Sequence, residues 1–321
     1  MDRGPCIEIR HVIDIGAQPI DQKMNVYVAN VDYMTNFDTW AAVQNGVQSL
    51  ITPEIDVQRR YMYNGRALAT FTRVDELYQA YFVAYLAMNT FGVRTNPGNP
   101  YLAFKKQQAF GTFGGPDIAA TLGAVARVAL NAVWYQKWVV HLRHRPESGG
   151  GIVHMMKSGI ASVAAKVDKL VLNSEALEQS QQKYGSYLLS QAFPEGSPTH
   201  PAYPTGHGAV GGACITVLKF FFDGQATLAN PMVPSADGLS LLPSGDAPLK
   251  VNGELHKLAH NISFGQGIHA GIHWRGDTDY SMLLGEAVAL RFLQDQAFTY
   301  NENFTVTLTK MDGTTATISN I

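Results

Sequence analysis

The chain has 321 residues, of which 46% are hydrophobic and 16% charged, and its formal net charge is −2. This length and composition predict a globular protein with a large buried core and exclude a disordered chain. The near-neutral charge disfavours nucleic acid and acidic membrane surfaces as partners, and two cysteines, Cys6 and Cys214, are too few for a disulfide framework.

The N-terminal part of the chain shows mixed patterns, with no clear helix before about residue 38. Residues 1–10 lack the apolar core of a secretory signal, and no apolar run reaches the roughly 20 residues that cross a bilayer. The sequence therefore predicts a soluble chain and leaves its localisation open. From residue 67 to 91 apolar side chains recur at helical spacing, which predicts a helix.

The middle of the chain predicts a long helix over 118–144. Asp117 follows a Gly/Pro-rich loop and is a candidate N-cap for this helix. Pro146 is expected to end it, because the residue before a proline avoids the α region.

Four further helices are predicted from apolar periodicity, at 160–182, 209–222, 253–262 and 280–296. Residues 223–250 are rich in Gly, Pro, Asp and Ser and predict a long surface connection. The tail alternates with period two around the tight-turn signal Asp312-Gly313, which predicts a hairpin.

The predicted fold class is thus mainly α, with β structure confined to the margins of the chain. We divide the chain into an N-terminal extension (1–60), a helical bundle (61–298) and a C-terminal β-hairpin tail (299–321).

The first candidate site segment is Lys137-Trp-Val-Val-His141-Leu-Arg-His-Arg145-Pro146. On a regular helix Lys137, His141 and Arg145 share one broad face. Cations beside apolar surface either reach solvent or share an anion, since unpaired buried charges are costly. A solvated basic helix end is the alternative, because the helix dipole favours cations there.

The second segment is Pro198-Thr-His200-Pro-Ala-Tyr-Pro-Thr205-Gly206-His207-Gly208, whose last four residues open a predicted helix. Free backbone N–H groups at a helix start bind anions, and glycine lets an anion approach the backbone closely. His207 can act as a general acid or base near neutral pH. The alternative is an ordinary N-cap turn.

The third segment runs from Gly265-Gln266-Gly267 to His269 and on to His273-Trp-Arg-Gly-Asp277. Two histidines four residues apart could share a metal, but the Glu of zinc-protease motifs is absent between them. A structural role for either histidine is the alternative.

In this order and spacing the three segments resemble the vanadate-binding signature of the vanadium-dependent haloperoxidases, bromide type, a superfamily shared with type 2 phosphatidic acid phosphatases. Lys137 and Arg145-Pro146 match the longer spacing of algal and cyanobacterial bromoperoxidases, and Thr205-Gly-His matches their Ser-Gly-His. The resemblance covers about residues 60–298 and includes Gly111-Thr-Phe-Gly-Gly-Pro and Gln191-Ala-Phe-Pro-Glu-Gly.

The resemblance implies a haloperoxidase-like helical bundle that uses vanadate and hydrogen peroxide to oxidise bromide or iodide to a hypohalous-acid equivalent, which halogenates small organic substrates. It implies that Lys137 and Arg145 balance oxyanion charge, that Thr205 and Gly206 hydrogen-bond its oxygens, and that His207 handles a proton. His273 would bind vanadium, and His200 would tune the bound peroxide. A homo-oligomer, a dimer or larger, is also implied.

The family arginine six residues before the metal ligand is absent, and Gln266 stands nearest to its place, with one extra residue, His269 for instance, before His273. Gln266 donates only neutral hydrogen bonds, which are about half as strong as charge-assisted ones. Two alternatives stay open: a phosphatase on the same oxyanion pocket with His273 as nucleophile, and, because of the replacement near Gln266, a catalytically weakened oxyanion-binding homologue.

Overall fold

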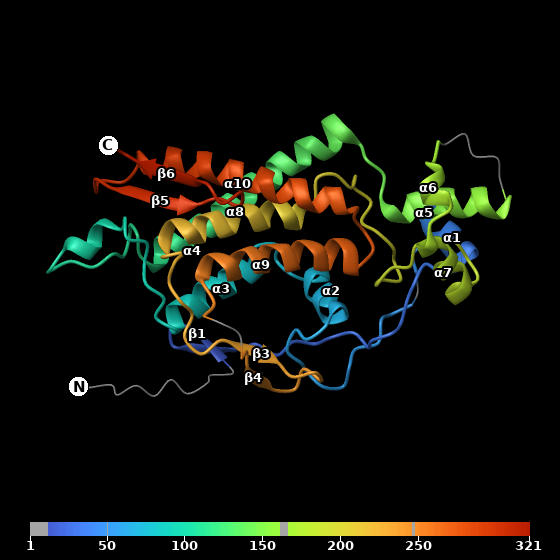
Figure 1. Cartoon of the computed structure of the whole chain (residues 1–321), viewed down its shortest axis with the longest axis horizontal. Coiled ribbons are helices and arrows are strands. Elements are labelled where there is room, and N and C mark those ends of the chain that lie inside the picture. Colours follow the sequence, from blue (N-terminus) through green and yellow to red (C-terminus); the bar gives the residue numbers. More distant parts are fainter. Residues whose placement is uncertain (1–11, 50, 161–165, 246–247) are drawn as a thin grey trace.

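The structure is a computed structural model that describes residues 12–49, 51–160, 166–245 and 248–321. Long helices run beside one another through its centre, and strands lie at its margins (Figure 1). The α-helices are α1 (Phe37–Gln44), α2 (Gly65–Arg73), α3 (Gln79–Thr90), α4 (Gly115–Tyr135), α5 (Pro146–Ser158), α6 (Lys169–Leu172), α7 (Glu175–Tyr184), α8 (Gly206–Phe221), α9 (Val251–Phe264) and α10 (Arg275–Ala297). A 3-10 turn, η1 (Pro100–Ala103), and two π-helical turns, η2 (Gln136–His141) and η3 (Gly265–His269), complete the helical structure.

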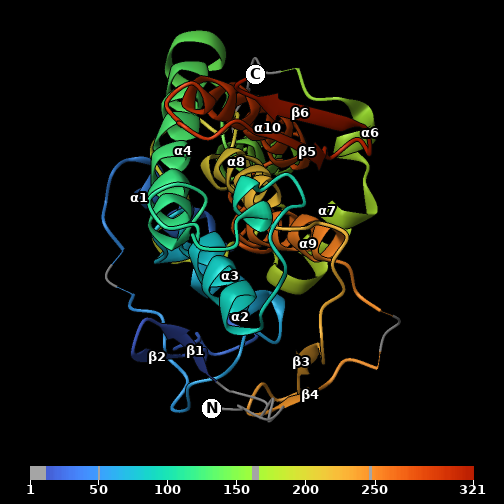
Figure 2. The same cartoon turned by 90° about the vertical axis from the view of Figure 1, so that its left-hand side faces the viewer.

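The strands pair in antiparallel hairpins: β1 (Val12–Ile15) with β2 (Gln18–Asp21), β3 (Met232–Pro234) with β4 (Leu241–Pro243), and β5 (Thr305–Thr309) with β6 (Thr315–Ser319). In the C-terminal hairpin Thr305 lies opposite Ser319 and Thr309 opposite Thr315. Figure 2 shows this hairpin at the opposite side of the bundle from the other two. The predicted fold class, mainly α with marginal β structure and a terminal hairpin, is confirmed.

Helix α8 is the centre of the bundle. It is buried on all sides from His207 to Phe221, as expected for a helix that is apolar all round. It packs against α4, α9 and α10. Glycines let α8 and α10 approach closely: a Cβ on Gly285 would lie 1.9 Å from the Ala209 carbonyl oxygen, and one on Gly212 would lie 2.0 Å from that of Met282.

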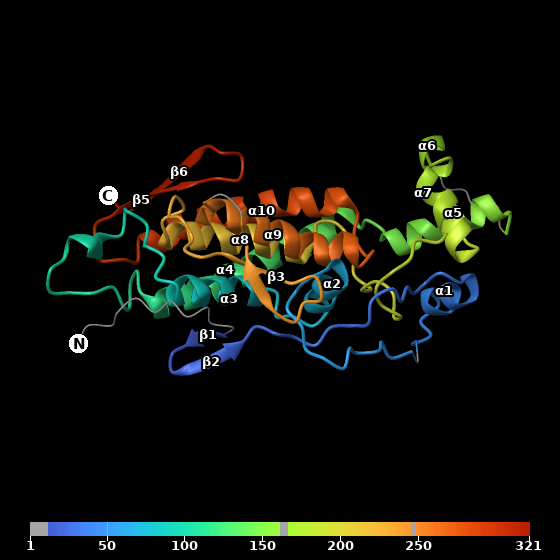
Figure 3. The same ribbon diagram turned by 60° about the horizontal axis from the view of Figure 1, so that its bottom comes forward.

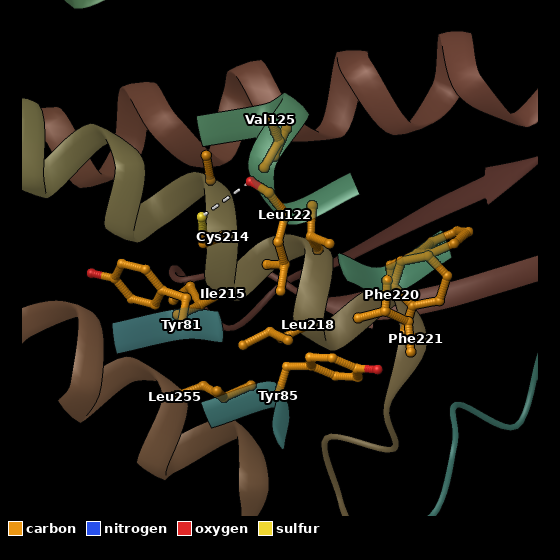
Figure 4. Close-up of a cluster of buried hydrophobic side chains, with 14 of the residues drawn as sticks. Tyr81, Tyr85, Leu122, Val125, Cys214, Ile215, Leu218, Phe220, Phe221 and Leu255 are labelled. Atoms are coloured by element: carbon orange, nitrogen blue, oxygen red, sulfur yellow. Dashed lines mark hydrogen bonds between the residues drawn. The ribbon is translucent and has the colours of Figure 1, made fainter. Parts of the chain in front are cut away.

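The main hydrophobic core surrounds α8 and joins side chains from both ends of the sequence. Figure 4 shows Ile215 and Leu218 of α8 between Tyr81 and Tyr85 of α3, Leu122 and Val125 of α4, and Leu255 of α9. Cys214 is buried here, with its Sγ 3.9 Å from the Leu122 carbonyl oxygen. Burial raises the pKa of the Cys214 thiol, so this cysteine packs as an apolar side chain. Cys6 lies outside the described residues.

Helices α1, α5, α6 and α7 lie together at one end of the molecule, as Figures 1 and 3 show. A small core of Met34, Trp40 and Leu188 holds this end. The Trp40 indole N–H donates to the Glu147 carbonyl at 3.1 Å. A Cβ on Gly151 would lie 1.9 Å from the Trp40 ring, so the glycines of α5 allow α1 to pack on it.

Several helix boundaries differ from the sequence predictions. The helix expected over 67–91 is two helices, α2 and α3, with a break between Arg73 and Gln79. Asp117 is not the N-cap of α4; Gly114 is, and an Asp117 carboxylate oxygen accepts the Phe113 N–H instead. The helix expected over 160–182 is instead two short helices, α6 and α7, and its residues 161–165 lie outside the described residues.

The long helix expected over 118–144 ends earlier than predicted. After α4 the chain forms η2 and turns at Leu142, which adopts the left-handed conformation (φ 47°). Pro146 does not stop this helix; it begins α5, where its missing N–H costs nothing. The expected connection over 223–250 carries the hairpin β3–β4.

Among the described residues one helical tract, Gly115–Ser158, has the length and apolar composition of a membrane-crossing helix. The tract is not one regular helix, because it contains α4, η2, the turn at Leu142 and α5. Its first part packs along α8 inside the main core. That contact accounts for the apolar face of α4.

Candidate functional site

A cavity of about 410 Å³ lies at the N-terminal end of α8. We call it the inner cavity. Residues of all three candidate segments line it: Lys137 from η2, His200 from the loop before α8, Gly206 and His207 from α8, and Gln266 and His273 from η3 and the turn after it. Other wall residues are Thr72, Arg73, Asp75, Leu77, Leu130, Trp134, Phe193, Glu195, Gly196, Ser197, Pro198 and Ile272. The fold therefore brings segments up to 136 positions apart (273 − 137) to one place.

Lys137 is fully buried, with 0% exposure. Its Nζ donates to the carbonyls of Pro201 (2.5 Å) and Ala202 (3.1 Å). Burial, and secondarily the charge of Arg145, lowers the pKa of Lys137 to about 7. No carboxylate forms an ion pair with this ammonium within the described ranges. A buried cation held only by carbonyls favours a bound anion.

Arg145 is the N-cap residue of α5 and is also buried. Its guanidinium donates to the His200 carbonyl (Nε, 3.0 Å) and the Ile272 carbonyl (Nη1, 3.0 Å). The same group lies 2.9 Å from His273 Nε2 and 3.0 Å from His200 Nδ1. Burial lowers the pKa of Arg145 to about 10, which still leaves it charged at neutral pH.

The expected common helix face of Lys137, His141 and Arg145 does not exist. The turn at Leu142 separates Arg145 from the helix that carries Lys137. His141 is exposed and packs its ring on Tyr203, with centroids 4.6 Å apart. Lys137 and Arg145 still lie beside the inner cavity. The turn at Leu142 brings them there, not a shared face of one straight helix.

The second segment forms the start of α8 as predicted, with Thr205 as N-cap. The Thr205 hydroxyl accepts the Gly208 N–H at 3.3 Å, and the residue is fully buried outside the cavity wall. The first backbone N–H groups of a helix have no partner within the helix. Gly206 and His207 are the first residues of α8 and line the cavity, so their N–H groups are available to an anion there. The direct contact of Thr205 with an oxyanion stays a prediction.

His207 has a partner that the sequence analysis missed. Its Nε2 lies 2.9 Å from Asp75 Oδ1, and the other Asp75 oxygen is buried with no hydrogen-bond partner among the described residues. Asp75 stands in the break between α2 and α3, 132 positions away. Nothing in the sequence pattern signals this contact.

His273 is 3% exposed, and its Nδ1 lies 3.3 Å from Asp277 Oδ2. Burial, then the charges of Arg145 and Lys137, lowers the pKa of His273 well below its usual value. The ring is therefore neutral, and the carboxylate of Asp277 favours the tautomer with the proton on Nδ1. That tautomer leaves the Nε2 lone pair available to a metal.

Asp277 anchors this corner of the site. It is fully buried, accepts the Trp274 N–H at 3.0 Å, and pairs with Arg143 at 2.8 Å. The sequence analysis included Asp277 in the motif without assigning it a role. The structure gives it one, the orientation of His273.

The histidine pair His269 and His273 does not form a metal site. His269 is exposed and lies over α2, where a Cβ on Gly65 would come within 2.5 Å of its Nδ1. Across the described ranges no group of three or more His, Cys, Asp or Glu side chains is placed to hold a metal ion. A metal at His273 would need most of its ligands from an anion such as vanadate.

Gln266 faces the inner cavity from the π-helical turn η3. It is 8% exposed, and its Oε1 has no hydrogen-bond partner in the described part of the chain. A π-helical turn holds one more residue than an α-turn, which agrees with the extra residue expected before His273.

His200 closes the inner cavity on the side of Arg145. Its ring stacks at a tilt on Trp134, with centroids 4.9 Å apart. Burial, followed by the charges of Lys137 and Arg145, lowers the pKa of His200 to about 4. The site is therefore a pocket with the buried Lys137 in its wall, the buried Arg145 beside it, the neutral rings of His200 and His273, and a helix N-terminus, a class of site that binds a tetrahedral oxyanion.

Comparison with known proteins identifies the family. A family model described as the VCPO second helical-bundle domain matches residues 118–302. The chain belongs to this family, and the family expected from the sequence is confirmed.

Curated relatives agree with this assignment. The vanadium-dependent bromoperoxidases of Corallina pilulifera and Corallina officinalis are each 36% identical over 327 residues, and that of Ascophyllum nodosum is 34% identical over 323 residues. These matches cover 95% of this chain but only 54–57% of the relatives. The chain thus spans little more than half of their length.

A solved structure matches the fold. The second vanadate-dependent bromoperoxidase of Ascophyllum nodosum, described as homohexameric, superposes with a TM-score of 0.86 at 29% sequence identity. The match covers 96% of this chain and 57% of that chain. The haloperoxidase-like helical bundle is therefore the fold of this chain.

Proposed function

We propose that this chain is a vanadium-dependent haloperoxidase that oxidises bromide or iodide with hydrogen peroxide and thereby halogenates small organic substrates. The observation that carries the proposal is the neutral, anchored His273 ring in the same cavity as Lys137, whose buried ammonium contacts carbonyls and no carboxylate in the part of the chain that the structure describes. Every relative reported above is named as a vanadium or vanadate-dependent bromoperoxidase.

The donor set fits vanadate. Lys137 and Arg145 supply positive charge, the start of α8 supplies N–H donors, and Gln266 in the cavity wall has an amide NH2 group that can donate. His273 would be the metal ligand through Nε2. Bound vanadate would supply a Lewis-acidic centre that activates hydrogen peroxide without a change in oxidation state.

The protein's own residues would do the remaining work. Arg145 lies 2.9 Å from His273 Nε2, so it would shift its hydrogen bond toward the anion when that nitrogen binds the metal. His207, held by Asp75 at 2.9 Å, would hold or release a proton at the cavity end of α8. His200 is neutral at physiological pH, and its Nδ1 accepts from Arg145 Nη2 at 3.0 Å, so the ring would donate a hydrogen bond to the peroxide from Nε2–H.

A bromination assay tests the proposal. The protein is incubated with vanadate, hydrogen peroxide and bromide, and bromination of a phenolic dye is followed. We expect activity that requires vanadate and disappears in His273→Ala. Phosphate release without peroxide would instead indicate the phosphatase, and absence of both activities would indicate an oxyanion-binding homologue without catalysis.

We also propose a homo-oligomer, because the structural relative is described as homohexameric. An apolar surface on η2 and the end of α4 supports this, since Tyr135 is 58%, Val139 64% and Leu142 64% exposed. Light scattering of the purified chain tests it, and a monomer at micromolar concentration would contradict it.

A further inference from the structure

A second cavity, of about 570 Å³, lies directly beside the inner cavity. We call it the outer cavity. Both cavities are lined by Glu195, Ser197, Pro198 and His200, so a single layer of side chains separates them. Its other walls come from the turn after α1, from η2 and from the start of α5, so the outer cavity lies where the end that carries α1 and α5 meets the bundle.

We propose that the outer cavity binds a neutral aromatic substrate, a phenol or naphthol, and presents it to the oxidised halogen formed in the inner cavity. This inference rests on the proposed haloperoxidase function and names the substrate class of that activity.

The apolar walls of the outer cavity support an aromatic ligand. Val43 and Val47 line it from α1 and the turn that follows, and Trp138 lines it from η2. Trp138 is 47% and Val47 59% exposed, so these side chains have apolar surface that a ligand would cover. A cavity of this size with aromatic and aliphatic walls is typical of small-molecule sites, which are mostly apolar.

The charged groups of the walls support a neutral ligand, because each already has a partner within the protein. Arg143 pairs with Asp277 (2.8 Å), Glu195 pairs with Arg73 (2.8 Å), and Glu147 accepts from Gln44 Nε2 and the Ser197 N–H. Arg145, 2.9 Å from His273 Nε2, would face the anion of the inner cavity under the proposed function. A charged substrate would have to break one of these contacts to find a partner of its own.

The chemistry balances with the reagents of the proposed function. Hydrogen peroxide oxidises bromide by two electrons and consumes one proton, giving hypobromous acid and water. A ring carbon of the phenol then attacks bromine, so that a C–Br bond forms and the Br–O bond breaks. The departing hydroxide takes the ring proton and becomes a second water. His200 belongs to both walls, so the oxidised halogen needs to pass only this layer to reach the ring.

The test fills the outer cavity without touching the inner one. Val47→Trp should lower kcat/KM for bromination of 2-naphthol at least about tenfold, because the larger side chain would occupy the space that the substrate ring needs in the pocket. Formation of triiodide from iodide and peroxide needs no organic substrate and should stay unchanged. The matched control Val57→Trp adds the same side chain at a fully exposed position outside both cavities and outside the proposed oligomer surface, and should alter neither rate.

A binding measurement separates this inference from the proposed function. Equilibrium dialysis of 2-naphthol against the vanadate-loaded protein should show binding that Val47→Trp abolishes, and naphthalene-2-sulfonate should bind more weakly. If the protein oxidises no halide, the proposed function fails while dialysis still decides whether the cavity binds a phenol. Equal kcat/KM in Val47→Trp and wild type, with brominated isomers in the ratio given by free hypobromous acid, would overturn the inference.

Discussion

Lys137 has a buried ammonium group whose pKa, about 7, lies far below its usual value because burial penalises the charge. An anion in the inner cavity would compensate that charge and raise the pKa again. Below pH 7 the group is already protonated before the anion binds. Above pH 7 binding must also take up a proton, so affinity falls as pH rises, by up to about tenfold per unit for one proton.

Titration calorimetry of vanadate binding between about pH 6 and 9 checks this linkage. Vanadate itself ionises in this range, so Lys137→Met is the matched control: its affinity should be lower overall but should fall less steeply with pH, by the contribution of one proton. Parallel curves for the two proteins would show that Lys137 does not take up the proton.

Gln266 lines the same cavity with a neutral amide. In Gln266→Arg a charge-assisted hydrogen bond replaces a neutral one, and vanadate affinity should rise about ten- to a hundredfold, equivalent to roughly 1.5–3 kcal/mol. Without an anion the third buried cation should lower the melting temperature, and vanadate should restore it.

Gln266→Met serves as the uncharged control for that variant. It should leave the melting temperature without anion nearly unchanged and should not strengthen vanadate binding. An affinity in Gln266→Arg equal to that of wild type would mean that this side chain does not reach the anion.

Among the elements, α8 and α9 could be predicted from the sequence because their apolar patterns are long and uninterrupted. Helix α5 could not, because Ser148-Gly-Gly-Gly151 is a run of poor helix formers. Its glycines allow contacts with Trp40 and Leu189, and that tertiary packing overrides local propensity.

The candidate site likewise contains residues that the sequence could predict and contacts that it could not. The residue types and their spacing pointed to Lys137, His207 and His273, and all three line the inner cavity. The π-helical turns that aim Lys137 and Gln266 have no periodic signature of their own, and the Asp75–His207 contact joins positions 132 apart. Such features depend on the folded backbone, so no local pattern contains them.

The packing of α10 on α8 determines where the N-terminus of α8 lies. Gly285→Ala would place a Cβ 1.9 Å from the Ala209 carbonyl oxygen, so the helices must separate. We expect a loss of at least about 1–3 kcal/mol in the free energy of unfolding, measured in urea. Vanadate binding should weaken as well, because Ala209 is three residues from Gly206.

Gly123→Ala in α4 is the matched control. A Cβ there meets nothing within 4 Å, and alanine is the better helix former, so stability should stay equal or rise by about 0.5–1 kcal/mol. Equal stability of Gly285→Ala and wild type would contradict the close helix contact.

At the scale of the whole molecule, the main core extends from Ile13 of β1 to Ile318 of β6. Val306 and Leu308 of β5 alternate with exposed threonines and point into the same core as α8 and α10. The division at residues 60 and 298 remains a prediction, but these contacts indicate that the hairpin and the bundle unfold together.

The hairpin permits a direct test of that cooperativity, because all four tryptophans (Trp40, Trp134, Trp138 and Trp274) lie outside residues 299–321 and their fluorescence reports the rest of the chain. Leu308→Ala leaves a cavity in the shared core and should lower the free energy of unfolding by about 2–5 kcal/mol. If the core is one unit, the fluorescence midpoint in urea shifts by that full amount, in a single transition that matches circular dichroism. The exposed Thr315→Ala on β6 should cost less than about 1 kcal/mol. A fluorescence midpoint that stays in place while the hairpin signal is lost earlier would instead make residues 299–321 an independent appendage, with no part in holding α8 and its end at the inner cavity in position.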